Sequence, residues 1–232
     1  AALQRAAEDV AAAVVEQTAV EDHADRINNA APIVLDGGRI SYSGRSAAAS
    51  TESLGAVTAT NSGFSTIRVT PGGSGSATLT LAGITRPAGS TFSVQGNSLG
   101  QSGNSSRILV VGGLGGNLAP VNGIVPGVVA GDPGSLPWPV GYNAGSGFGP
   151  VGTAGYPPYY NPGGNNFSGA GPATNIYGSG TVASGGQAVN TLIASYVAFL
   201  NDSDTLILNA GMWTQGGDAT FGFGSPSIRG KL

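Results

Sequence analysis

The sequence predicts an all-β fold built as a parallel β-solenoid. Apolar and polar residues alternate in many runs of five to seven residues, and Gly, Pro, Asn or Ser bounds each run, as is typical of strands. Gly contributes 41 of 232 residues, without the every-third-residue pattern of collagen. Only 9% of the residues are charged, compared with roughly 25% in an average soluble domain. The apolar content of 40% is too high for a disordered chain.

The alternating runs fall in two regions, residues 30–111 and 175–232, which we expect to form solenoid coils. In the first, a tight turn at Asp36-Gly37-Gly38 separates two strands, because Asp-Gly readily adopts the positive φ angles of such turns. The further strand-like runs are LGAVTAT, FSTIRVT, ATLTLAG, STFSVQG and RILVVGG, followed in the second region by TNIYGSGTVASGG, NTLIASYVAFLN, DTLILNAGMW and ATFGFGSPSIRG.

The outward-facing positions favour a solenoid over a β-sandwich, the other architecture that many short strands suit. Sandwich strands have short hairpin loops and charged outer faces. Here the outward positions are uncharged, and neighbouring coils about 4.8 Å apart would stack them into hydrogen-bonded ladders. An imperfect repeat, SATLTLAGITRPAGS and SDTLILNAGMWTQGG, also indicates a solenoid. The outward residues expected are Thr78, Thr80, Ser93, Thr205 and Asn209.

Residues 1–29 differ from the rest of the chain. They contain no Gly and half of the twelve acidic residues, and Leu3, Ala7, Val10 and Val14 follow helical spacing. We therefore expect a helix at about 2–20 that acts as a cap or docking arm.

A long insertion is expected at residues 112–174. Pro and Gly are dense here, and at this density they argue against both a long helix and a central strand. Loops of this length are usually functional, disordered or interaction elements. Aromatic residues bury area at little entropic cost, so five of them are predicted partner contacts, with covering of a solenoid face and sugar binding as the alternatives. These residues are Trp138, Phe148, Tyr156, Tyr159 and Tyr160.

Several segments resemble the autotransporter-associated β-strand repeat proteins. The most specific are the Thr-Leu-x-Leu-x-x-Ile-x-Arg-x-x-Gly run at Thr78–Gly89 and the tripeptide Asn122-Gly123-Ile124; overall, the resemblance covers roughly residues 25–127 and 175–232. It implies a right-handed β-solenoid, export from a bacterium and a structural or adhesive role. It implies no catalytic residues. The amino-terminal segment and the aromatic insertion depart from the family pattern.

Few residues offer chemistry. His23 is the only histidine and there is no Cys, so Ser-His-Asp, thiol and histidine-rich zinc sites lack their parts. Asp202 and Asp204 are weak candidates for a calcium site, with a polar turn as the alternative, and Asp218 is a weaker one. We expect no cofactor and no catalysis, with a polysaccharide lyase or hydrolase as the enzymatic alternative.

The predicted function is structural. A net charge of −3 with scattered basic residues provides no footing for nucleic acid, and no apolar run is long enough for a transmembrane helix. We expect an extracellular or cell-surface component of a bacterial fibre, surface layer or adhesive stalk, acting by self-association into a homo-oligomer or filament. Both termini read as cut from a longer protein. The alternative is a β-helix that binds or cleaves carbohydrate, such as a surface polysaccharide.

Overall fold

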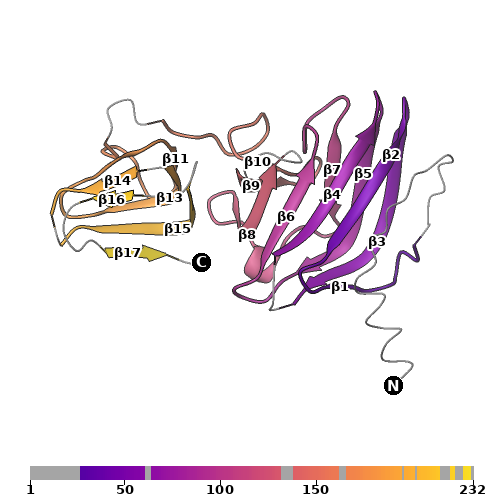
Figure 1. Cartoon of the computed structure of the whole chain (residues 1–232), viewed down its shortest axis with the longest axis horizontal. Coiled ribbons are helices and arrows are strands. Elements are labelled where there is room, and N and C mark those ends of the chain that lie inside the picture. Colours follow the sequence, from indigo (N-terminus) through magenta and orange to yellow (C-terminus); the bar gives the residue numbers. More distant parts are fainter. Residues whose placement is uncertain are drawn as a thin grey trace, which may run out of the picture. The chain divides into compact units, whose positions relative to one another are not determined.

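The chain folds into two compact units. The computed structural model describes residues 27–60, 64–131, 138–161, 166–194, 196–201, 203–214, 220–222 and 227–230. Unit 1 comprises Ala1–Ala119 and Gly127–Pro150, and unit 2 comprises Pro120–Pro126 and Val151–Leu232. Each unit is all-β with parallel sheets (Figure 1). The helix predicted at 2–20 and His23 lie outside the described residues.

Unit 1 contains two sheets. Sheet A has the strand order β1-β3-β5-β7, with β1 (Ile33–Leu35), β3 (Ala49–Ala59), β5 (Ser76–Thr85) and β7 (Ser106–Val110). Sheet B has the order β10-β9-β8-β6-β4-β2, with β2 (Arg39–Ser46), β4 (Phe64–Gly72), β6 (Thr91–Gly96), β8 (Ile124–Gly131), β9 (Trp138–Asn143) and β10 (Gly147–Pro150). A short 3-10 helix, η1 (Gly116–Leu118), precedes β8.

From β1 to β8 consecutive strands alternate between the two sheets, and each of β1 to β6 pairs in parallel with the second strand after it. In contrast, β8, β9 and β10 all lie in sheet B, and β10 pairs antiparallel with β9. Arg39 of β2 pairs with Thr66 of β4, which pairs with Ser93 of β6, so these three strands repeat every 27 residues. The next spacing is longer, because Phe92 of β6 pairs with Val128 of β8, 36 residues further on. β1 and β2 do not pair with each other; the predicted turn between them, in which Gly37 has a φ of 70°, is a corner between sheets. Parallel pairing of this kind differs from the hairpin pairing of a sandwich.

The interior of unit 1 is formed by apolar columns. Along β5 the residues alternate between buried and half-buried, as expected when one face of a strand meets a core. Leu79 stacks on Ile108 and Leu81 on Val110, and all four side chains are buried. Each such side chain stabilises the fold by roughly 1.5–3 kcal/mol through burial.

Hydroxyl columns line the outer face of sheet A, as the sequence predicts. Thr51 pairs with Thr78 and Ser53 with Thr80, each half-buried or exposed. Thr58 and Thr85 share a hydrogen bond between their hydroxyl oxygens, which lie 3.0 Å apart. Of the other predicted outward residues, Thr205 and Asn209 are half-buried, whereas Ser93 is buried.

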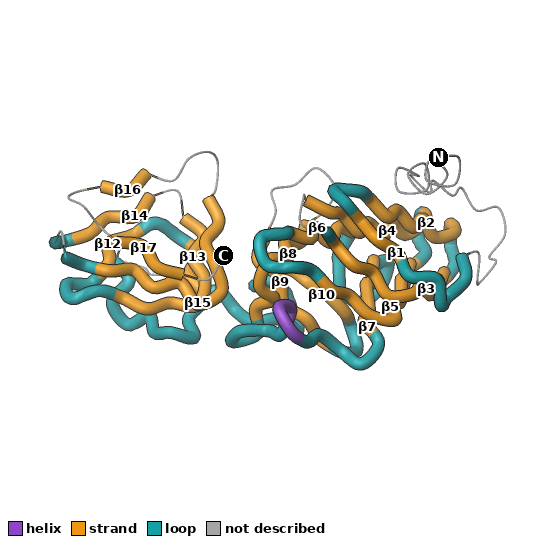
Figure 2. The backbone as a smooth tube through the Cα atoms, turned by 90° about the horizontal axis from the view of Figure 1, so that it is seen from below, coloured by secondary structure: helices purple, strands orange, loops and turns teal. Residues whose placement is uncertain are grey.

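Unit 2 repeats the alternation with shorter strand spacing. Sheet C contains β11 (Asn175–Tyr177), β13 (Gln187–Ala194), β15 (Thr205–Thr214) and β17 (Ser227–Gly230), and sheet D contains β12 (Gly180–Val182), β14 (Tyr196–Phe199) and β16 (Thr220–Gly222). Asn175 pairs with Thr191 and Gln187 with Leu206, spacings of 16 and 19 residues. The tube in Figure 2 shows the loops at the corners between these strands. The buried hydrophobic cluster of unit 2 includes Phe167, Ile176, Leu192 and Phe199.

The prediction that residues 112–174 form an insertion loop is wrong. This segment contains β8, β9 and β10, which extend sheet B. Its prolines within strands lie near the strand ends: Pro126 precedes the part of β8 that pairs with β6, Pro139 is the second residue of β9, and Pro150 is the last residue of β10. Proline density therefore fails to exclude a strand when each proline sits near a strand end.

The described residues contain no helix that is long and apolar enough to cross a membrane.

Candidate interaction site at the ends of the sheets

The hairpin β9–β10 closes one end of unit 1. The two strands are antiparallel, and Tyr142 pairs with Phe148. The Phe148 side chain is completely buried and meets the Tyr142 ring edge-on, with ring centroids 5.0 Å apart. The ring pair therefore anchors the hairpin in the interior.

Tyr142 supplies hydrogen bonds that a further strand would otherwise make to the last residue of β7. Its hydroxyl accepts a hydrogen bond from the Val110 N–H at 2.9 Å and donates one to the Val110 carbonyl at 3.1 Å. Gly147, with a φ of 81°, lets β10 approach β7 closely, because a Cβ there would lie 2.2 Å from the Ile108 carbonyl oxygen. The edge of sheet A at β7 is thereby covered, so it is a poor template for another chain.

The opposite end, at β1 and β2, is open in the part of the chain that the structure describes. Each of these strands pairs on one side only there. The Thr66 N–H donates to the Gly38 carbonyl at 2.9 Å, and backbone groups alternate in direction along a strand, so the N–H groups of Arg39, Ser41 and Ser43 point away from β4. Val34 on β1 is 57% exposed. Within the described residues, β2 is therefore an eight-residue edge strand with a further strand on one side only, although its Arg45 N–H already donates to the Ser50 hydroxyl at 2.9 Å.

Two of the five predicted contact residues belong to the interior. Phe148 is completely buried and Tyr156 is 8% exposed. This corrects the prediction for these two residues, because their rings fill the chain's own core and leave almost no surface for a partner.

The other three predicted residues keep some exposure. Trp138 is half-buried at the start of β9. Tyr159 packs against the cluster of Ile124, Val151 and Ala210, and burial together with nearby Tyr177 raises the pKa of its hydroxyl above the ordinary range. Tyr160 is 42% exposed. Its backbone extends sheet C beyond β11, because its N–H donates to the Asn175 carbonyl at 2.7 Å and its carbonyl accepts from Tyr177 at 3.1 Å.

Unit 2 contains an asparagine network that the sequence analysis missed. Asn122 and Gly123 both have positive φ, and they form a two-residue turn between Val121 and Ile124, whose backbones exchange hydrogen bonds of 2.7 and 3.0 Å. The amide of Asn190, which is completely buried, donates to the Asn175 side chain at 2.8 Å and to the Val121 carbonyl at 3.2 Å. The Asn122 amide in turn donates to the Asn190 side chain at 3.3 Å. The network joins the turn to sheet C.

Buried Arg86 explains the arginine of the Thr78–Gly89 motif. Its guanidinium donates to the carbonyls of Ser90 at 2.7 Å and Pro87 at 3.3 Å, which holds the turn between β5 and β6. Burial lowers the pKa of this guanidinium below its ordinary value. A Cβ at Gly127 would lie 2.2 Å from the centre of the guanidinium, so glycine is required beside it.

Of the three candidate calcium ligands, only Asp204 lies within the described residues; Asp202 and Asp218 do not. The Asp204 side chain is buried, and its carboxylate accepts hydrogen bonds from the backbone N–H groups of Gly185 at 2.8 Å and Asn201 at 2.9 Å. Its oxygens thus hold a corner together. Burial raises the pKa of Asp204, but these hydrogen bonds outweigh that effect and hold it below its ordinary value. No cluster of three metal-binding side chains occurs among the described residues.

Two further carboxylates, Asp36 and Glu52, lie among the described residues of unit 1. Asp36 accepts a hydrogen bond from the Thr60 hydroxyl at 2.6 Å at the corner between β1 and β2. Glu52 is buried on the inward side of β3.

The fold and its ends define an all-β protein with parallel sheets, in which one unit carries a covered and an open sheet edge. Comparison with family models, with characterised proteins and with solved structures finds no match to the chain. The resemblance to the autotransporter-associated repeat proteins therefore stays a prediction.

Proposed function

We propose that this chain forms part of a right-handed β-solenoid that acts as a structural component of a bacterial surface or extracellular assembly, by self-association. The observation that carries this proposal is the inequality of the two ends of unit 1. One end is covered by the hairpin and Tyr142. The other presents the open edge of β1 and β2 within the described residues. An open strand edge is a template for another strand.

The partner edge in this proposal belongs to unit 2 of a second copy. Among the described strands, β16 and β17 are the last in sheets D and C. A contact between these strands and β1 and β2 of the next copy joins two different surfaces. Such a contact does not close on itself and produces a filament.

Strand connectivity and surface chemistry support the solenoid. Connections between parallel strands of one sheet are right-handed in about 98% of cases, which favours the right-handed form. Hydroxyl columns such as Thr58 and Thr85 place uncharged groups at the spacing of neighbouring strands. Like charges at that spacing would repel, so the low charge content suits stacking of coils and of copies. The absence of Cys is compatible with a bacterial exported protein.

The test is a proline placed on the open edge. In the Ser41→Pro variant, β2 loses an N–H that points away from β4, so the pairing of β2 with β4 is retained. Ser41→Thr is the matched control, because it keeps the N–H and a hydroxyl. We expect filaments from the wild type and from Ser41→Thr in negative-stain electron microscopy, and dispersed particles from Ser41→Pro with the same thermal unfolding midpoint.

Dispersed wild-type particles across a concentration series would contradict self-association. Filaments that persist in Ser41→Pro would contradict the role of the β2 edge. A parallel sample in EDTA tests whether a divalent cation is part of the contact.

A further inference from the structure

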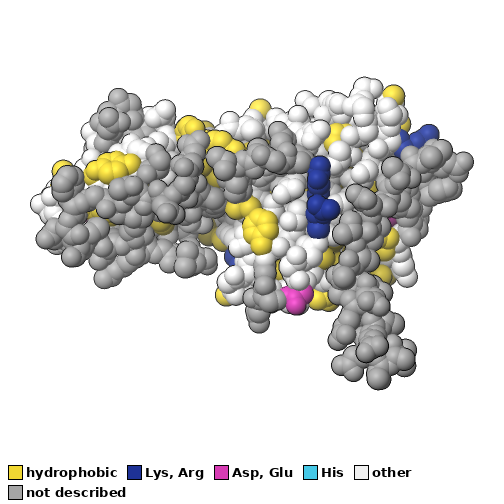
Figure 3. Space-filling model, viewed as in Figure 1, with side chains coloured by type: hydrophobic (Ala, Val, Ile, Leu, Met, Phe, Trp, Pro, Cys, Tyr) yellow, Lys and Arg dark blue, Asp and Glu magenta, His cyan; other side chains and the backbone are white. Residues whose placement is uncertain are grey.

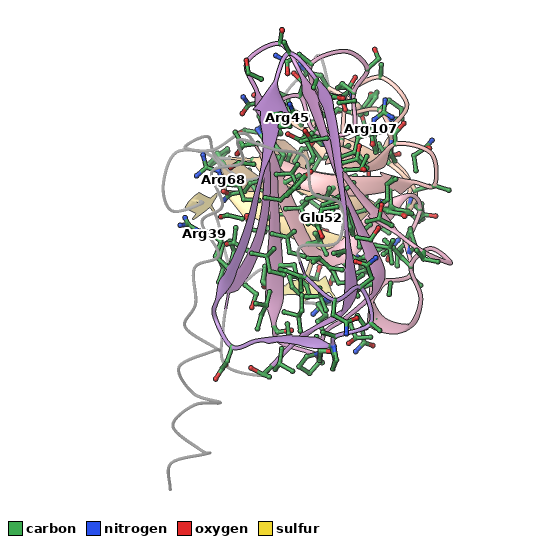
Figure 4. The ribbon with its side chains drawn as sticks, turned by 90° about the vertical axis from the view of Figure 1, so that its right-hand side faces the viewer. Arg39, Arg45, Glu52, Arg68 and Arg107 are labelled. Carbon is green, nitrogen blue, oxygen red and sulfur yellow. The ribbon has the colours of Figure 1, made fainter. Side chains whose placement is uncertain are left out.

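The outer face of sheet B carries two arginines on neighbouring strands. Arg39 of β2 pairs with Thr66, and Arg68 lies two residues further along β4. Both side chains lie on the same side of unit 1 in Figure 4, whereas Arg107 lies on the other side and Glu52 lies between the sheets. Strand spacing and rise put the two arginine Cα atoms about 8 Å apart.

Neither arginine is neutralised by a described carboxylate. The described part of unit 1 has five arginines but only two acids, Asp36 and Glu52. Asp36 sits at a corner with Thr60, and Glu52 is buried on the inward side of β3. The Nε atoms of Arg68 and of Arg107 are both buried without a hydrogen-bond partner among the described residues, so this feature does not distinguish the two sheets. What distinguishes Arg68 is its neighbour Arg39 on the adjacent strand.

Neutral polar and aromatic groups surround the arginines. Ser41 and Gln95 pair with Arg68 on either side, and all three are half-buried. Phe64 is 53% exposed at the start of β4, on the same face. In Figure 3 the visible surface of unit 1 is mostly white, with dark-blue basic side chains in its midst.

We propose that this face binds an acidic polysaccharide, a polymer of uronate or sulfated sugars. The guanidinium groups bind carboxylates or sulfates through paired N–H donors, a geometry that arginine provides and lysine does not. The Ser41 hydroxyl and the Gln95 amide both donate and accept, which suits sugar hydroxyls. Phe64 offers an apolar ring for the face of a sugar.

Other polyanions suit this face less well. Tight binding of nucleic acid depends on neutralising many phosphates, and the described residues of unit 1 include five arginines spread over both sheets and their corners. The acidic segment 1–26 of the chain itself, with six carboxylates, is the competing occupant that the experiment must separate.

The experiment measures binding of the whole 232-residue chain to polygalacturonate by biolayer interferometry, with neutral dextran as the reference polymer. Arg39→Gln and Arg68→Gln are each expected to weaken binding roughly tenfold, as expected for the loss of a charge-assisted hydrogen-bonded pair. Arg107→Gln is the matched control, because it removes the same charge from the outer face of sheet A, and binding is expected to change less than twofold. Higher salt is expected to weaken binding of the wild type.

Three results would overturn the proposal. The first is equal loss in Arg39→Gln and Arg107→Gln, which would indicate attraction to overall charge. The second is dextran binding as strong as polygalacturonate binding. The third is displacement of bound polygalacturonate by a synthetic peptide of residues 1–26 at micromolar concentration, which would assign the face to the acidic segment. Unchanged thermal unfolding of the variants shows that any loss is local.

Discussion

Strands alternate between two sheets from β1 to β8 in unit 1 and from β11 to β17 in unit 2, but the two units bury different polar groups. In unit 1, the buried Ser106 ties one sheet to the other by a single bond: its hydroxyl donates from β7 to the Val69 carbonyl of β4 at 2.8 Å. In unit 2, buried asparagines join several segments at once, and Asn190 alone contacts the side chains of Asn122 and Asn175 and the backbone of Val121.

The difference follows from the length of the repeat. In sheet B the spacing is 27 residues from β2 to β4 and from β4 to β6, and 36 from β6 to β8, whereas sheet C begins with spacings of 16 and 19. A shorter repeat has fewer inward positions for apolar side chains and brings corners closer to the core. An amide has two donors and an acceptor with two lone pairs, so one buried asparagine satisfies several backbone groups where a serine satisfies one or two. Unit 2 thus obtains from buried hydrogen bonds part of the stabilisation that unit 1 obtains from burial of apolar side chains.

The largest effect is expected from the core of unit 1. Phe92 is completely buried in β6. Phe92→Ala should lower the free energy of unfolding by about 3–5 kcal/mol, because it removes apolar contacts and leaves a cavity. Hydrogen exchange should accelerate in β4 and β6 but not in sheet C. Phe64→Ala, at an exposed position of the neighbouring strand, is the control with little expected effect; equal losses would refute the packing assignment.

Asn190→Ala should produce the second largest effect, in unit 2. It removes the donors to Asn175 and Val121 and the acceptor for Asn122, at an expected cost of about 3 kcal/mol in unfolding free energy. Urea denaturation measures the change, and hydrogen exchange locates it in β11 and β13. Asn209→Ala, which removes one hydrogen bond to the Pro172 carbonyl, should cost about a third as much. A smaller loss from Asn190→Ala than from Asn209→Ala would contradict the network.

Ser106→Ala should have a smaller effect than Asn190→Ala. The serine makes one hydrogen bond, to the Val69 carbonyl, and its removal should cost about 1 kcal/mol. Ser106→Val tests the space as well as the bond, because a Cβ at Gly96 would already lie 2.4 Å from the Ser106 Cβ. A cost from Ser106→Ala equal to that of Asn190→Ala would remove the distinction between hydroxyl and amide connections.

The smallest effect is expected from the pH dependence of stability that Asp204 contributes, which leaves stability at neutral pH unchanged. Its folded-state pKa lies below the unfolded value of about 3.9, so its contribution is fully present above that value and is lost as pH falls through the folded pKa. The midpoint of thermal unfolding in the wild type should therefore decrease below about pH 4. The unfolding midpoint of the Asp204→Asn variant should decrease less over the same pH interval. Parallel curves for the two proteins would exclude Asp204 as the group responsible.

The sequence predicted the strands and corners of both units because alternation and glycine-containing turns are local signals. The turn at Asp36 and Gly37 and the outward positions of Thr78 and Thr80 are confirmed. The strands within 112–174 were missed because proline density says nothing about where each proline lies in a ladder. Phe148 and Tyr156 were wrongly predicted as contact residues for a related reason, because an aromatic residue type alone does not indicate whether the side chain lies in a core or on a surface.

The polar partners were not predictable from the sequence. Asn122 and Asn190 are 68 residues apart, and no periodic pattern connects them. The Asn-Gly pair does signal a tight turn, yet the turn's contacts in sheet C depend on the folded arrangement of unit 2. The arginine pair on sheet B required the strand register, since Arg39 and Arg68 become neighbours only through the 27-residue repeat.

The hydroxyl pair of Thr58 and Thr85 has a consequence for the conditions under which this face is stable. Neither threonine hydroxyl ionises between moderately acidic and moderately alkaline pH, and neither attracts a counterion. Their hydrogen bond is the same in fresh water and in brine. A face stabilised by such pairs therefore keeps its structure over a wide range of pH and salt concentration.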